Sequence, residues 1–336
     1  MKGAAPLLLS LFACATPSAG IQETRTPEAF YVVNTQGDSV SLVDLSEMRE
    51  TRRIEVGKEP YGVVALPDGK RVAIGVEGEG KVKFFDNTDY RLLAEVEIGR
   101  MHHDHLMLTA DQRYLLDANY YSDTVVGIDV KTMKEAFRIE GASAPHVVKY
   151  GPRRKHVYVT CKKITGIAVM DPAKRELVAF HQLKVNPRGL TFDEDETKLF
   201  FGSFWVDGFF EMDIATGKVT KLHRLPTPEG DSAPRKVTYH GCEGLDHDIV
   251  LAANEGRSFI DAVNYRTGAH LDRFSGASKP CCIERIPGPP GAPMRVLISN
   301  IGDDSMQLLE VSPEGKMKEL GKARVGAHPK RVSFVY

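Results

Sequence analysis

One short pattern, two apolar runs joined by a polar turn, recurs along the whole chain and limits the fold more than any other feature. Its first copy runs from Phe30 to Asp44, and Asn34 ends the first apolar run. The residues that end the second run form a column: Asp44, Asp86, Asp129, Asp171, Asp213, Asn264 and Glu310. Subtracting the residue numbers gives steps of 42, 43, 42, 42, 51 and 46. A period of this length indicates a repeat protein.

Two further columns keep the same period. Ten residues before each member of the first column stand Asn34, Val76, Asn119, Cys161, Ser203, Asn254 and Asn300. A third column, mostly proline, opens each unit: Pro60, His103, Pro145, Pro187, Pro234, Pro280 and Pro329. Turn signals such as Leu66-Pro-Asp-Gly-Lys70 separate the apolar runs. Each unit therefore reads as four short strands, which is typical of one blade of a β-propeller.

The two ends of the chain complete each other. The unit opened by Pro329 ends at Tyr336 after a single strand, and residues 30–59 supply the strands that it lacks. Pairing the ends in this way removes the free sheet edges that an open array would expose. The sequence thus predicts an all-β fold, a seven-bladed β-propeller with the last blade closed by the N-terminal strands.

Several segments resemble the YVTN-repeat family of seven-bladed β-propellers. Tyr31-Val-Val-Asn34 and Tyr158-Val-Thr-Cys161 are similar to the motif that names the family, and Pro60-Tyr-Gly-Val63 and Pro67-Asp-Gly-Lys70 to its opening segment and turn. The likeness covers about residues 30–336. It implies the fold. It leaves the function open, because the superfamily includes surface-layer proteins, lactonase-like enzymes and haem d1-binding relatives.

The first 20 residues have the pattern of a secretory signal peptide. An apolar run from Ala4 to Ala13 is too short to span a membrane, and Ala13-Cys14-Ala15 offers a cleavage site. Leu11-Phe-Ala-Cys14 also resembles a lipoprotein box, so lipidation of Cys14 is the alternative to simple cleavage. We therefore expect a periplasmic or secreted protein without a transmembrane segment, in which residues 30–336 form a single propeller domain.

Charge and cysteine content restrict the function further. The formal net charge is −1, which does not favour nucleic-acid binding. Cys161, Cys242, Cys281 and Cys282 follow the signal region without a Cys-x-x-Cys pair. Export permits disulfides. A bridge between Cys242 and the Cys281–Cys282 pair and a set of free thiols both remain open.

The residues that follow the opening column are the main candidates for a functional site. The first strand of a propeller blade lines the central channel, so these residues should form a ring at one mouth. Candidates for ligand binding are Tyr61, Asp104, His146, Arg188, Arg235, Lys236, Lys330 and Arg331. Cations predominate among them, which favours a small anionic ligand such as a carboxylate, a phosphate or a propionate-bearing cofactor. The alternative is a water-filled channel that holds no ligand.

A second candidate is a metal site near Met101-His-His-Asp-His105. On a strand, His103 and His105 face the same side. Imidazole with thiolate suits zinc or copper. The candidate ligands are His103, His105, His146 and Cys281. A transition metal or a haem-type ligand is the cofactor that this set would hold, and a histidine could also serve as a general base. The alternative is a histidine-rich loop whose side chains are hydrogen-bonded to their neighbours.

These features support two main functions. The first is an exported binding or scaffold protein that holds an anionic ligand or a partner protein at the channel mouth. The second is an enzyme of the lactonase-like or haem d1-handling, metal-dependent oxidoreductase type that uses the same mouth. A structural surface protein is a third reading. The repeated aspartates, one per blade, are expected to cap turns rather than to catalyse a reaction. The sequence leaves the oligomeric state open.

Overall fold

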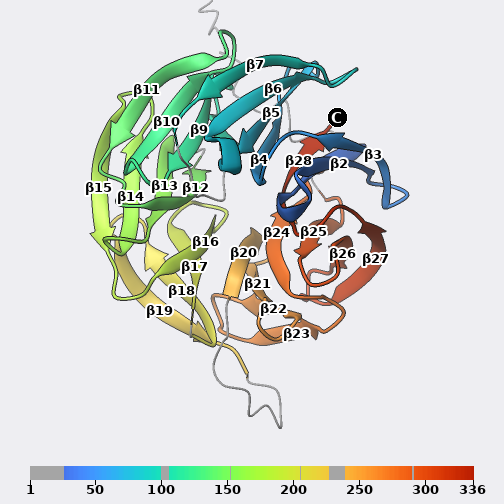
Figure 1. Cartoon of the computed structure of the whole chain (residues 1–336). Coiled ribbons are helices and arrows are strands. Elements are labelled where there is room, and N and C mark those ends of the chain that lie inside the picture. The colour runs from blue at the N-terminus through green and yellow to red at the C-terminus, as the bar shows by residue number, and fades with distance from the viewer. Residues whose placement is uncertain (1–25, 100–105, 152, 205, 227–238, 290) are drawn as a thin grey trace, which may run out of the picture.

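The computed structural model forms a ring of seven four-stranded sheets (Figure 1). It describes residues 26–99, 106–151, 153–204, 206–226, 239–289 and 291–336, with the backbone alone over 239–242. Within each sheet the strands are antiparallel, and the first strand of each blade lies nearest the axis of the ring. The predicted all-β, seven-bladed fold is confirmed.

The strands follow the period of the sequence. The blade that closes the ring pairs β28 (Pro329–Val335), β1 (Ala29–Asn34), β2 (Ser39–Asp44) and β3 (Arg49–Glu55). The next three contain β4 (Pro60–Ala65), β5 (Arg71–Val76), β6 (Lys81–Asp86) and β7 (Leu92–Glu97); β8 (Leu106–Leu108), β9 (Tyr114–Asn119), β10 (Thr124–Asp129) and β11 (Lys134–Glu140); and β12 (Pro145–Gly151), β13 (His156–Cys161), β14 (Gly166–Asp171) and β15 (Glu176–Gln182).

The remaining blades have the same order. They contain β16 (Pro187–Phe192), β17 (Lys198–Ser203), β18 (Gly208–Asp213) and β19 (Lys218–Arg224); β20 (Tyr239–Leu245), β21 (Ile249–Asn254), β22 (Phe259–Asn264) and β23 (His270–Phe274); and β24 (Pro280–Arg285), β25 (Met294–Asn300), β26 (Ser305–Val311) and β27 (Met317–Arg324). Two short 3-10 turns, η1 (Thr35–Gly37) and η2 (Glu77–Glu79), complete the described elements.

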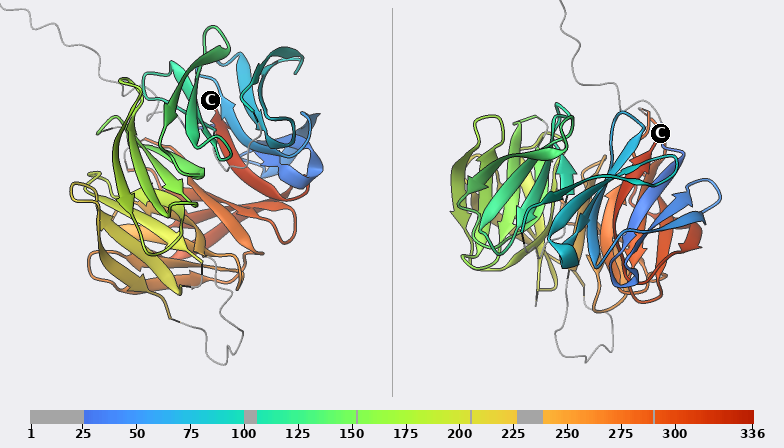
Figure 2. Two further views of the ribbon diagram at one scale, coloured as in Figure 1. Left: turned by 60° about the vertical axis from the view of Figure 1, so that its left-hand side comes forward. Right: turned by 45° about the horizontal axis from the view of Figure 1, so that its top comes forward.

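The ring closes as the sequence predicts. Strand β28 pairs with β1, with Phe334 opposite Phe30 and Val332 opposite Val32. In Figure 2 the C-terminal strand, coloured red, lies beside the blue N-terminal strands. The last blade therefore takes its inner strand from one end of the chain and its three outer strands from the other. This closure leaves neither end of the array as an open sheet edge.

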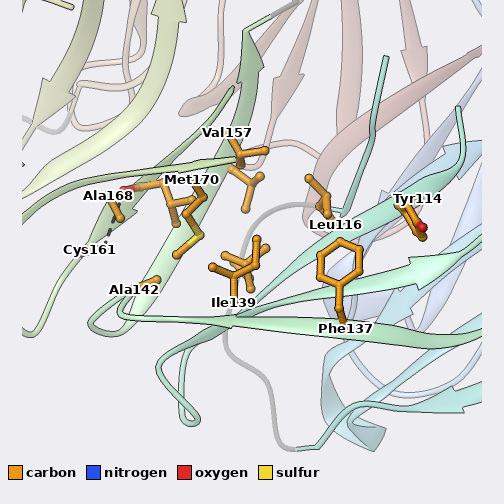
Figure 3. Close-up of a cluster of buried hydrophobic side chains, with 13 residues drawn as sticks. Tyr114, Leu116, Phe137, Ile139, Ala142, Val157, Cys161, Ala168 and Met170 are labelled. Carbon is orange, nitrogen blue, oxygen red and sulfur yellow. Dashed lines mark hydrogen bonds between the residues drawn. The ribbon is translucent and has the colours of Figure 1, made fainter. Parts of the chain in front are cut away.

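The hydrophobic core lies between neighbouring blades. Alternate residues of a strand face one side of its sheet, so each blade presents an apolar face to the next. In the cluster of Figure 3, Tyr114 and Phe137 of one blade pack with Val157 and Met170 of its neighbour. The rings of Tyr114 and Phe137 meet edge to face with centroids 5.0 Å apart. Contacts of this kind hold the blades at the angles that a ring requires.

The repeated aspartates cap turns, as predicted. Asp44 Oδ1 accepts the backbone N–H of Glu47 at 2.8 Å, and Asp129 Oδ1 accepts that of Thr132 at 2.8 Å. These backbone donors hold the pKa of both carboxyls below its ordinary value. Both residues lie at the outer part of their blades, where the third strand turns into the fourth. Their role is structural.

A β-bulge recurs where the inner strands begin. In β12, Pro145 pairs with Cys161 and the next pair is Val148 with Val159, so two residues oppose one. Equivalent shifts follow the opening residues of β4, β16, β20 and β24, and β28 shifts in its pairing with β1. A bulge bends the strand and redirects its side chains. The residues predicted to form the mouth therefore lie on irregular rather than flat strand.

The pairing also corrects one column assignment. Tyr239 pairs with Asn254, as Pro145 pairs with Cys161 and Pro187 with Ser203. Tyr239, not Pro234, thus opens the fifth repeat. The assignment to Pro234 was wrong because the inserted residues of this repeat precede the inner strand. The insertion contains prolines, and one of them was mistaken for the proline that opens a repeat. By this pairing, His240 is the residue that directly follows the opening residue of the fifth repeat.

Candidate ligand site on the axis of the ring

Six of the predicted site residues lie in the described part of the chain. They are Tyr61, His146, Arg188, Cys281, Lys330 and Arg331. The others, His103, Asp104, His105, Arg235 and Lys236, lie outside the described residues. The six come from five inner strands, and those that directly follow an opening residue contact one another between neighbouring blades. We call this end of the ring, where the inner strands begin, the entry end.

His146 and Arg188 form one contact at the entry end. Arg188 Nη1 lies 3.3 Å from His146 Nε2, and the guanidinium carbon lies 3.7 Å from the centre of the Phe204 ring. A guanidinium can only donate hydrogen bonds, so Nε2 of His146 accepts and the imidazole is neutral in this pairing. Stacking on Phe204 adds a cation–π contact. The two partners hold the cationic group of Arg188 in one orientation.

Lys330 and Cys281 form a second contact. Lys330 Nζ lies 3.2 Å from Cys281 Sγ and 5.6 Å from the centre of the Tyr61 ring. Only 6% of Lys330 is exposed, and Cys281 is fully buried. The sulfur accepts the hydrogen bond because an ammonium has no acceptor. The entry end thus holds at least two buried or half-buried cations next to aromatic rings.

The middle of the ring holds charged residues that the sequence analysis missed. Lys149 Nζ lies 3.5 Å from Glu243 Oε2, although 94 residues separate them in the sequence. Burial opposes the charge on Lys149, but the carboxylates of Glu243 and Glu284 outweigh burial and raise the pKa of Lys149. The positive charge of Arg331 acts to lower the pKa of Lys149. Lys149 and Glu284 each stand four residues after an opening proline, which is the signal that could have indicated them. Glu243 takes the same place only when Tyr239 is recognised as the opening residue of its repeat.

Glu243 has the most unusual environment of these groups. Burial raises the pKa of its carboxyl to about 7, and the charge of Lys149 opposes that rise. Only 8% of Glu243 is exposed. A carboxyl that titrates near neutral pH can hold or release a proton under ordinary conditions. The predicted excess of cations is thus partly balanced, because two carboxyl groups lie within electrostatic reach of Lys149.

A cavity of about 840 Å³ opens at the other end of the ring, where the inner strands end. We call it the exit cavity. Its charged lining residues are Lys149, Arg153, Asp193, Glu194, Glu196, Glu243, Asp246, Arg285 and Arg295. Several are engaged in the fold: Arg285 Nη2 lies 2.7 Å from Asp246 Oδ2, and Glu196 accepts the backbone N–H of Arg153 at 2.8 Å. Lys149 and Glu243 both line this cavity, so their contact in the middle of the ring is part of its wall.

Asp117 is a further buried acid that the sequence analysis did not name. It lies in β9 opposite Leu106 and is fully buried. Burial raises the pKa of its carboxyl to about 8, and the charge of Glu77 adds to the rise. The equivalent positions two residues before the second column are apolar, for example Ile74, Val159 and Ile298. An acid in an apolar column was therefore a readable signal.

The predicted metal site is not tested by the described residues. Among them, no group of three or more His, Cys, Asp or Glu side chains is placed to hold a metal ion. His103 and His105 lie outside this part of the chain. The contacts of the other two candidates differ: His146 meets Arg188, whereas Cys281 meets Lys330 and Cys282. Cys161, Cys281 and Cys282 are not joined in disulfides.

The likeness to known proteins lies in the fold. No protein-family model matches the sequence, and no curated protein matches it. Among solved structures, Kuenenia stuttgartiensis hydrazine synthase is similar, with a TM-score of 0.72 and 14% sequence identity; the match covers 86% of this chain and 94% of that one.

Two further structures extend the likeness. Dihydro-haem d1 dehydrogenase NirN is similar with a TM-score of 0.62 and 16% sequence identity, and the match covers 95% of this chain and 78% of that one. Pseudomonas aeruginosa periplasmic gluconolactonase PpgL is similar with a TM-score of 0.67 and 20% sequence identity. The match covers 92% of this chain and 99% of that one.

These neighbours share the fold of this chain. The chain is a seven-bladed β-propeller with the fold of lactonase-like and haem d1-type propellers, as the resemblance implied. The YVTN repeat name itself stays a prediction, because no family model supports it. In the described part of the chain, no helix has the length and apolar character needed to cross a bilayer.

Proposed function

We propose that this protein is an exported β-propeller that binds a small anionic ligand at the entry end of the ring. The observation that carries the proposal is the arrangement of Arg188, which is fixed by His146 on one side and by Phe204 on the other. A guanidinium held in one orientation loses little freedom when it binds a carboxylate or phosphate. Lys330, buried at the same end but three blades further round the ring, adds a second cation.

Export is part of this proposal. Residues 1–20 have the pattern of a signal peptide, and we propose simple cleavage, with lipidation of Cys14 as the alternative. A periplasmic or extracellular location fits that of the gluconolactonase neighbour, which is a periplasmic protein. A partner protein that presents a carboxylate could use the same cations, so ligand size is left to experiment.

The test is a binding measurement on the mature chain. Isothermal titration with acetate, citrate and inorganic phosphate should reveal at least one bound anion. The substitution R188Q should weaken that binding about ten- to a hundredfold, since a hydrogen bond to a charged group contributes about 1.5–3 kcal/mol. R266Q is the matched control, because Arg266 also stacks on an aromatic ring but is exposed on the outside of its blade. Equal binding by R188Q and the wild type would refute the proposal.

One observation favours a second function, an acid–base enzyme that uses the exit cavity. Glu243 lines that cavity and has a pKa near 7. Such a carboxyl could take a proton from water during hydrolysis of an ester or lactone, while Lys149 stabilises negative charge. Gluconolactone is the probe that the gluconolactonase neighbour suggests. Hydrolysis by the wild type that is lost in E243Q but kept in R188Q would support this second function over the first.

A further inference from the structure

Cys281 and Cys282 are adjacent in β24, yet their side chains meet. On a regular strand, neighbouring side chains point to opposite faces of the sheet. Here the two Sγ atoms lie 3.7 Å apart. The cause is the bulge, because Pro280 pairs with Asn300 and Cys282 with Ser299, which leaves Cys281 as the extra residue. The backbone N–H of Cys282 donates to Ser299 Oγ at 3.0 Å and fixes this arrangement.

The sulfur separation suits one kind of metal ion. Two thiolates bound about 2.3 Å from a tetrahedral ion stand about 3.8 Å apart, whereas a linear ion with similar bonds would need about 4.6 Å. The observed 3.7 Å agrees with the tetrahedral value. The two side chains could therefore chelate one divalent, thiophilic ion such as Zn²⁺ or Cd²⁺ with little rearrangement.

Lys330 is the charged residue next to the two cysteines. Its ammonium donates to Cys281 Sγ at 3.2 Å, and an ammonium beside a sulfur stabilises the thiolate, which is the form that binds metals. Hydrogen bonds from outer groups to the ligands of a metal orient them and tune their affinity. Tyr61 lies near the same ammonium, with 5.6 Å between Nζ and the ring centre.

We propose that Cys281 and Cys282 form a dithiolate site for a single Zn²⁺-type ion, with Lys330 as the donor to one ligating sulfur. Two thiolates balance the charge of a divalent ion, and the protons they release pass to solvent. Two tetrahedral positions remain for water or for an anion. Cys281 and Cys282 are 0% and 5% exposed, so a small ion is a better occupant than a bulky thiol reagent. This inference does not depend on anion binding by Arg188.

The experiment titrates the reduced, full-length mature protein with Cd²⁺ and then with Zn²⁺. Cd²⁺ should produce an ultraviolet sulfur-to-metal charge-transfer band that saturates at one ion per chain, and Zn²⁺ should displace it. C281S and C282S should each lose the band. K330M should weaken binding about tenfold or more, as loss of an outer-shell partner does. C161A is the matched control, because Cys161 is equally buried but lies in another blade, in β13.

A second measurement avoids dependence on variants that fail to fold. In the wild type, bound Zn²⁺ should protect Cys281 and Cys282, but not Cys161, from slow alkylation by iodoacetamide, as read by peptide mass spectrometry. Two results would overturn the proposal. One is a reduced protein that binds neither ion. The other is binding that persists in C281S and C282S, or equal protection of all three cysteines.

Discussion

Replacing Glu243 with glutamine should change how the stability of this protein depends on pH. The carboxyl titrates near 4.5 as a model group and near 7 when it is buried in the folded ring. The difference of about 2.5 pH units corresponds to about 3 kcal/mol, at about 1.4 kcal/mol for each unit. Glu243 is only 8% exposed, so solvent screening reduces this figure little. The charge of Lys149 is already included in the net rise of the pKa.

The direction of the effect follows from proton linkage. A group whose pKa is higher in the folded state than in the unfolded state favours folding at low pH, where both states hold the proton. That contribution is lost as the pH rises from about 4.5 through about 7, because the unfolded chain ionises first. Glutamine carries no titrating proton. The wild type should therefore lose about 3 kcal/mol of stability relative to E243Q across this range.

The assay is urea unfolding of both proteins at several pH values between 4 and 9. Groups distant from Glu243 titrate alike in both proteins, so the difference in unfolding free energy isolates Glu243 and its partner Lys149. Loss of the contact with Lys149 in E243Q adds an offset, but that offset stays constant while Lys149 remains charged. E47Q is the matched control, because it makes the same substitution at a side chain that is 57% exposed. A difference between wild type and E243Q that does not vary with pH would refute the reasoning.

Three further predictions concern the fold. Deleting residues 329–336 removes β28 and exposes the edge of β1, so the protein should unfold or oligomerise; light scattering that shows a stable monomer would contradict ring closure. G62A places a Cβ 2.7 Å from Leu106 Cβ and should cost about 2 kcal/mol in thermal or urea unfolding, whereas G75A, with 3.8 Å to its nearest neighbour, should cost little. D193A removes a carboxylate that accepts the backbone N–H groups of Thr197 and Lys198, each at 2.8 Å, and should also cost about 2 kcal/mol; an unchanged urea midpoint would contradict that role.

The repeat architecture was readable from the sequence because its determinants are local. A capping aspartate and the backbone N–H it accepts are two or three residues apart, as in Asp44 with Glu47. The alternation of apolar residues likewise lies within single strands. A period that holds over seven units, together with an incomplete last unit, then leaves closure by the N-terminal strands as the arrangement without an open edge.

The composition of the candidate site was only partly readable. In the structure, His146 contacts Arg188 and Cys281 contacts Lys330, because neighbouring blades present equivalent positions to each other. The column after the opening residues contains all four, but it does not say which of them meet. It failed in the fifth repeat, where only pairing of Tyr239 with Asn254 shows which residue begins the inner strand. An insertion changes the spacing without leaving a local mark of where the strand resumes.

The sequence by itself determined the number of blades and their turns, because these follow from a local pattern that recurs along the chain. The closure of the ring was readable as well, although β28 and β1 lie at opposite ends of the chain, because the last unit lacks the strands that the first residues supply. The tertiary structure decided what meets at the axis. Lys149 reaches Glu243 across 94 residues, and a bulge in β24 turns two adjacent cysteines toward each other. Both depend on strand register and on the packing of blades around the ring, which no single repeat contains.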